Sequence, residues 1–174
     1  GDGSNFPRYD HSLYLEVSRY VAGTMLTRAY FDSHKLIPGV RTTADFTFFN
    51  DLTLDFTGFN GRESRYNKDF IDEDSPDYLT RIFYKHERQM MRFMLNVRQN
   101  IRESSPLYWL AGITAFNMDI KPTRRHKLKD DVPNTPTLFE NYCTWNIINP
   151  KEQDGGFNTY LKAGFGIDTR DNEA

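Results

Sequence analysis

The sequence predicts an all-β fold, an antiparallel meander of six to eight strands with a short helix in one long loop. Apolar and polar residues alternate along several long runs, which places successive side chains on opposite faces of a strand. Turn residues such as Pro38-Gly39 separate these runs. Aromatic residues reach 15%, with 14 Phe and 10 Tyr, although hydrophobic residues make up only 38% of the chain. The 174 residues, 1–174, are expected to form a single domain.

The first two runs predict a hairpin. From His11 to Val21, apolar Leu13, Leu15 and Val17 alternate with polar neighbours. The alternation resumes from Met25 to Asp32, after a short link that suits an antiparallel pair. The segment Ser33 to Gly39 ends in Pro38-Gly39 and is expected to be a turn.

The longest alternation runs from Val40 to Phe59 without a break in phase. It predicts either one very long strand or two strands joined by a tight turn at Asn50-Asp51, since globular strands usually have about 3 to 10 residues. The following segment, Asn60 to Asp77, is polar and acidic and is expected to be a loop.

The segment Tyr78 to Arg102 carries two patterns at once. Met90, Met94, Val97 and Ile101 have the spacing of one face of a helix. Met91, Phe93, Leu95 and Val97 also alternate with a second set, as in a strand: Arg92, Met94, Asn96 and Arg98. Both interpretations stay open for the part from Arg88 to Arg102. A further strand is predicted from Tyr108 to Asn117.

A long charged connection, Lys121 to Phe157, precedes the last strand. Within it, Thr137 and Glu140 have the spacing of a capping box, and Asn149-Pro150 can end a helix, so a short helix is predicted from Leu138 to Ile148. In the last run, Leu161, Ala163, Phe165 and Ile167 share one face, and the opposite face carries Tyr160, Lys162, Gly164, Gly166 and Asp168.

Several function classes find no support in the residues. The net charge of −2 does not favour a nucleic-acid partner. The four histidines stand apart and Cys143 is the single cysteine, so no metal site is predicted. We expect no enzyme and no cofactor, because no nucleophile, base and orienting group stand out. The acids between Asp69 and Asp77 are interpreted as a solvated loop, with a weak divalent-cation site as the alternative. A basic cluster is interpreted as a solvated loop, or else as a surface for lipid phosphates or acidic glycans; it comprises Lys121, Arg124, Arg125, His126, Lys127 and Lys129.

Charged residues within the predicted strands indicate which environment each face of the sheet meets. Arg41, Asp45, Asp51, Asp55, Arg92, Arg98 and Lys162 all fall on predicted polar strand faces. A water-filled lumen accommodates such a face, and the apolar faces would then meet lipid. The pattern therefore predicts part of a transmembrane β-barrel. The alternative is a soluble antiparallel β-barrel or sandwich that binds a lipid or another small ligand.

The end of the chain, AGFGIDTRDNEA, resembles a strand and turn of the BamA/TamA family, the bacterial surface-antigen barrels. The residues that carry the resemblance are Gly164, Gly166, Asp168, Thr169, Arg170, Asp171 and Asn172, among which Arg170 could bridge Asp168 or Asp171. The resemblance implies a bacterial outer-membrane location and a role in assembling or inserting outer-membrane proteins. The implied partners are outer-membrane lipid, unfolded outer-membrane protein clients and the missing remainder of the chain's own barrel. A surface adhesin or passive pore is the alternative role.

The number of strands decides on which side the loops lie. With six strands, Asn60 to Asp77 and Lys121 to Phe157 lie on the same side, which is extracellular if the turn after Asp168 is periplasmic. With eight strands, the acidic loop moves to the other side. Because membrane barrels keep their long loops on one side, six strands are favoured. The chain begins at Gly1 without Met and is expected to be a portion of a longer barrel protein.

Overall fold

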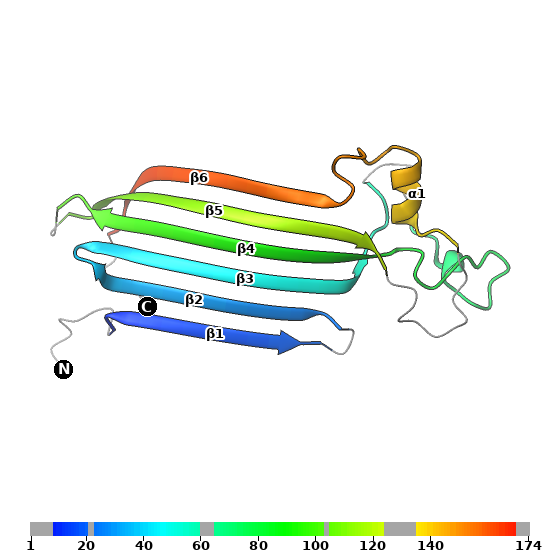
Figure 1. Ribbon diagram of the computed structural model, residues 1–174, viewed down its shortest axis with the longest axis horizontal. Helices are drawn as coiled ribbons and strands as arrows, with labels where there is room; N and C mark the ends of the chain where they lie inside the picture. Colours follow the sequence, from blue (N-terminus) through cyan, green and yellow to red (C-terminus); the bar gives the residue numbers. More distant parts are fainter. Residues whose placement is uncertain (1–8, 21–22, 60–64, 103–104, 124–134, 170–174) are drawn as a thin grey trace.

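The computed structural model describes residues 9–20, 23–59, 65–102, 105–123 and 135–169. In these residues the chain forms one antiparallel sheet of six strands, in which each strand pairs with the next along the sequence (Figure 1). The strands are β1 (His11–Arg19), β2 (Met25–Ile37), β3 (Val40–Asp55), β4 (Lys85–Asn100), β5 (Leu107–Pro122) and β6 (Gly155–Ile167). The predicted meander is therefore confirmed, with the lower of the two strand counts.

Both ambiguous segments form single long strands. Residues Val40–Asp55 continue through Asn50-Asp51 without a turn, and a register shift lies between Asp51 and Leu54. Residues Lys85–Asn100 are a strand, so the helix alternative for this segment is wrong. Its alternation prevails because Phe93 and Leu95 lie opposite Phe46 and Ala44 of β3, and the sheet satisfies the backbone on both sides.

Several predicted boundaries need correction. β1 ends at Arg19, two residues early, whereas β2 continues to Ile37, so that the turn of the second hairpin is only Pro38-Gly39. Gly39 has a φ of 74°, a conformation that a glycine adopts without strain. β5 reaches Pro122 and β6 starts at Gly155, which shortens the long connection at both of its ends.

The two ends of the sheet differ. The short-turn end carries the turn at Pro38-Gly39 and, between β4 and β5, residues 101–102 and 105–106. The loop end carries the end of β1, the start of β2 and the described parts of the two long connections, residues 56–59, 65–84 and 135–154, which lie at one end of the molecule in Figure 1. The expectation that both long loops share one side is thus confirmed.

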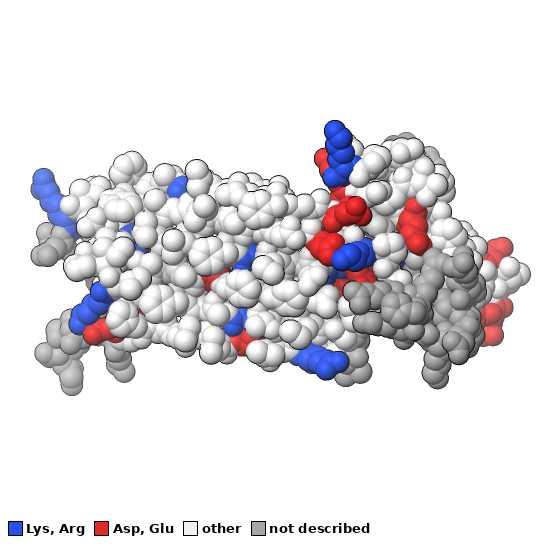
Figure 2. Space-filling view, viewed as in Figure 1, with Lys and Arg blue, Asp and Glu red and all other residues white. Residues whose placement is uncertain are grey.

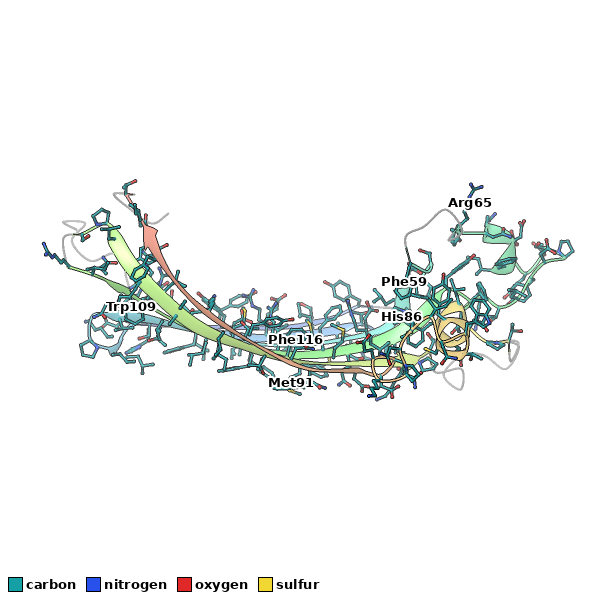
Figure 3. All side chains as sticks on the ribbon, turned by 90° about the horizontal axis from the view of Figure 1, so that it is seen from above. Phe59, Arg65, His86, Met91, Trp109 and Phe116 are labelled. Atoms are coloured by element: carbon teal, nitrogen blue, oxygen red, sulfur yellow. The ribbon has the colours of Figure 1, made fainter. Side chains whose placement is uncertain are left out.

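The sheet is strongly curved along its length. Figure 3 shows it edge-on, with Phe116 on the concave side and Met91 on the convex side. Because side chains alternate, Phe116 marks the face that also carries Arg92 and Asn158, its neighbours in register. The polar faces of the strands are therefore concave, and the apolar faces are convex.

Among the described residues, the buried hydrophobic side chains lie at the loop end rather than along the sheet. The buried apolar side chains there are Ile82, Phe83, Tyr84 and Phe139. The ring of Phe139 packs on those of Phe56 and His86, with ring centroids 5.7 and 5.4 Å away. We call this loop-end unit the cap. It consists of residues 65–84 and the helix α1 (Leu138–Thr144).

Helix α1 forms where the capping box predicts it. The Thr137 hydroxyl accepts from the Glu140 backbone amide at 3.3 Å, and the Glu140 carboxylate accepts from the Thr137 amide at 2.7 Å. The helix ends at Thr144 rather than at Ile148, because Asn146 has a φ of 56° and breaks the helical backbone. In the described part of the chain, no helix is long and apolar enough to cross a bilayer.

Candidate functional site

The convex face presents a continuous apolar surface. No described element covers it, and many of its large side chains are exposed; Leu161 and Phe165, for example, have 81% of their surface accessible. In the face-on view of Figure 2, the surface over the strands shows only small patches of charged residues, and the larger ones gather toward the two ends. The large exposed apolar residues of this face are Leu13, Leu15, Val17, Phe46, Met91, Phe93, Leu95, Leu107, Phe157, Leu161, Phe165 and Ile167.

The height of this apolar band can be read along β4. Its convex positions are Met91, Phe93, Leu95 and Val97, with Gln89 and Gln99 as the polar limits. From Gln89 to Gln99 the strand advances about 33 Å at about 3.3 Å per residue. A strand tilted by about 40° would make this a band about 25 Å tall, the height of the apolar belt of membrane barrels.

The concave face holds a buried carboxylate between two arginines. Asp45 is 2% exposed and accepts from Arg28 Nε at 2.8 Å and from the Thr47 hydroxyl at 2.8 Å. Arg92 Nη2 lies 3.6 Å from the other side of the same carboxylate. Arg28 and Arg92 both pair in register with Thr47, so both reach Asp45 diagonally, from β2 and from β4. The negative charge of Asp45 is thereby compensated from both neighbouring strands.

A second carboxylate, Asp32, is also 2% exposed and lies nearer the short-turn end. Arg41 binds it with both arms of its guanidinium, through Nε at 3.1 Å and Nη2 at 2.8 Å. The Tyr9 hydroxyl donates to the same carboxylate at 3.1 Å, and His34 Nε2 lies 4.0 Å away. This bidentate pair ties β2 to β3 on the concave face.

The described part of the family-like motif lies against a third cluster. Arg98 of β4 contacts the Asp168 carboxylate at 3.1 Å and stacks on Tyr108, with Cζ 3.8 Å from the ring centroid. The Tyr108 ring in turn covers Gly166, where a Cβ atom would come within 2.3 Å of the ring. A Cβ at Gly164 would meet no atom within 4 Å. The structure thus brings Gly166 and Asp168 together with Arg98, which the sequence did not link to the motif.

Some of the other predicted site residues lie within the described part of the chain, and the rest lie outside it. Thr169 follows β6 and belongs to no helix or strand. Arg170, Asp171 and Asn172 lie outside the described residues. In the basic cluster, Lys121 pairs with Asp119 at 2.5 Å, and the members at 124–129 also lie outside the described residues. Asp55 lies past the register shift at the loop end and pairs with Lys85. The remaining predicted lumen charges lie on the concave face.

The charges of the concave face are unevenly distributed. Strands β1 to β3 carry its carboxylates Glu16, Asp32, Asp45 and Asp51, together with Arg28 and Arg41. Strands β4 to β6 carry Arg88, Arg92, Arg98 and Lys162, and Asp168 follows β6. Among the described residues, Arg88 and Lys162 have no carboxylate partner. The β4 to β6 half of the concave face therefore has an excess of positive charge.

Sequence reasoning missed Tyr9, Arg28 and Asp32 as members of the concave clusters. The signal was present for two of them, since Arg28 and Asp32 share the parity of the polar face within β2. The two faces of β2 differ little in polarity, so this signal was weak. Tyr9 precedes β1, and no strand pattern includes it.

No cluster of three or more His, Cys, Asp or Glu residues that could hold a metal occurs in residues 9–169 outside the gaps named above. The single cysteine, Cys143, lies in α1 and is half-buried. Burial, together with nearby Asp154 and Glu140, raises the pKa of its thiol above the ordinary value. This favours a thiol that stays protonated and reacts slowly at neutral pH.

Comparisons with known proteins found no match for this sequence. No family model, no curated protein and no solved structure matches the chain. The likeness to the BamA/TamA family therefore rests on the residues from Gly164 to Asn172 alone.

Proposed function

We propose that the sheet is part of a transmembrane β-barrel in the bacterial outer membrane. The observation that supports this most directly is the division between its two faces. An uncovered apolar belt runs over the convex face, and paired charges with 2% exposed carboxylates fill the concave face. A soluble barrel or sandwich would bury its apolar face inside and turn its charges to water, which is the reverse of this curvature.

The open edges extend the proposal. Within the described residues β1 and β6 each pair on one side only. Unpaired backbone amides and carbonyls are costly in lipid, so a barrel wall in the membrane must continue at both edges. We propose that further strands complete the wall here, which makes the remainder of the barrel the first partner of this sheet.

The assembly role is the second part of the proposal. The motif residues Gly164 to Asn172 resemble the BamA/TamA family, and on this basis the barrel would take part in assembling or inserting outer-membrane proteins. Its clients would be unfolded outer-membrane proteins. Depletion of the protein in its host should then lower the amounts of other outer-membrane barrels, whereas an adhesin or passive pore should leave them unchanged.

The two tryptophans test the orientation in the membrane. Trp109 lies on the convex side of β5, and Trp145 follows α1 in the cap with 58% of its surface exposed. We expect brominated lipids to quench Trp109 in the Trp145→Phe variant, and to leave Trp145 unquenched in the Trp109→Phe variant. Heat-modifiable migration of the folded chain in detergent is the second measurement. Equal quenching of both tryptophans, or a chain that stays folded and monomeric without detergent, would contradict the membrane proposal.

A further inference from the structure

A pocket of about 350 Å³ opens in the cap at the loop end of the sheet. Residues from the end of β3, from the connection that follows and from the start of β4 line it: Asp55, Thr57, Tyr66, Ile71, Arg81, Tyr84 and Lys85. Its volume falls at the lower limit of small-molecule sites, which start at about 300 Å³. It is separate from the concave clusters and lies at the loop end of the sheet, where Asp55 ends β3 and Lys85 begins β4.

One wall of the pocket is aromatic and held in place. Tyr84 is buried, and its hydroxyl accepts from the Asn67 backbone amide at 2.9 Å. Its ring packs against Phe83 and Tyr66, with centroids 4.9 Å away in both cases. Tyr66 is exposed beside it. The pair offers aromatic ring surface to the pocket, which suits a ligand that has an apolar face.

The charges of the pocket leave one cation available. Lys85 pairs with Asp55, so these two charges compensate each other. Arg81 is exposed, and no carboxylate among the described residues pairs with it. The guanidinium group can bind a carboxylate or a phosphate with two parallel hydrogen bonds. The pocket therefore favours a ligand with one negative charge next to a ring or a polyol.

We infer that this pocket binds an anionic sugar, whose ring lies on the Tyr66–Tyr84 wall and whose carboxylate or phosphate meets Arg81. The inference goes beyond the proposed membrane role and does not depend on it, because the lining residues belong to the cap, to the strand ends beside it or, in the case of Thr57, to the connection that follows β3.

The test titrates the folded full chain in detergent with glucuronate, glucose 6-phosphate, glucose and inorganic phosphate, followed by calorimetry and saturation-transfer NMR. We expect saturable binding of at least one anionic sugar and much weaker binding of glucose. Arg81→Gln should weaken this binding about tenfold or more, because it removes a charge-assisted contact. Tyr66→Ala should weaken it as well. Preference for glucuronate or for glucose 6-phosphate identifies the acidic group.

The matched control is Arg102→Gln, which removes the same charge at the short-turn end and should leave the affinity unchanged. Circular dichroism of each variant verifies the sheet. The inference is overturned if Arg81→Gln binds as tightly as the unaltered chain, or if glucose or inorganic phosphate binds as tightly as the anionic sugars. Absence of saturation with both anionic sugars also overturns it. None of these outcomes affects the tryptophan quenching that tests the barrel.

Discussion

The guanidinium group of Arg98 lies over the ring of Tyr108, with its Cζ atom 3.8 Å from the ring centroid. The two residues come from neighbouring strands, β4 and β5, and the same ring covers Gly166 of β6. One aromatic side chain therefore connects three strands near the short-turn end. This explains why a glycine is required at one position of the motif strand and not at the next concave position.

Gly166→Val should destabilise the sheet, and Gly164→Val should not. A side chain at position 166 would force the Tyr108 ring off Arg98, an overpacking cost of about 1–3 kcal/mol. At position 164 the added atoms enter open space. The measurement is the temperature at which the folded band disappears in heat-modifiability gels. A Gly164→Val variant that melts as early as Gly166→Val would contradict the role of Tyr108.

Thr137→Ala should destabilise helix α1 without affecting the sheet. The substitution removes the hydroxyl that caps α1, at a cost of about 1 kcal/mol. Hydrogen exchange at the Glu140 amide should then accelerate about fivefold, while amides of β4 keep their protection. The control is Thr144→Ala at the other end of the helix, whose exposed hydroxyl donates to the Glu140 carbonyl. Equal acceleration of exchange in both variants would show that the N-cap hydroxyl of Thr137 does not stabilise α1.

Removing positive charge from the concave face should change ion selectivity. If this face lines a lumen, Arg88→Gln combined with Lys162→Gln lowers the local preference for anions. Both residues lack a carboxylate partner among the described residues, so no buried carboxylate loses its counter-charge. In planar bilayers with a KCl gradient, the reversal potential of the complete barrel should shift toward cation selectivity. Arg19→Gln combined with Arg102→Gln removes equal charge outside this face and should cause no shift.

Cys143 provides a test of sidedness. Because the cap lies at the loop end, a membrane-impermeant maleimide should label Cys143 on intact cells. An Arg102→Cys, Cys143→Ser variant, with its thiol at the short-turn end, should be labelled only after the outer membrane is opened. The reversed result would invert the proposed topology.

The labelling rate of Cys143 should also depend on pH in a defined way. Burial raises the pKa of this thiol, so the thiolate fraction at pH 8 is smaller than for an ordinary cysteine. The rate should therefore continue to rise with pH beyond the point where a cysteine in a short unstructured peptide levels off. A profile that coincides with the peptide control would contradict the burial of the thiol.

Local patterns predicted much of this fold because alternation is a local property. The long strand Val40–Asp55 and the capping box of α1 both follow from residues close together in sequence. The concave clusters do not, because they depend on register. Asp45 meets Arg92 only when Phe46 lies opposite Phe93, and a slip of one residue would place these charges in the apolar belt. The cap pocket was equally out of reach, since it joins a strand end to residues of a connection without periodicity.

The directions of the two edge strands limit how the wall can close. β1 leaves the short-turn end and β6 returns to it, so the edges are antiparallel to each other. Any additional stretch of wall must therefore begin antiparallel to β6 and finish antiparallel to β1, which only an even number of added strands achieves. The total would then be even as well, as in single-chain bacterial barrels. An odd total would require one pair of parallel strands in the wall. The antiparallel edges of this sheet therefore predict an even number of strands in the complete barrel, which a structure of the complete barrel would reveal.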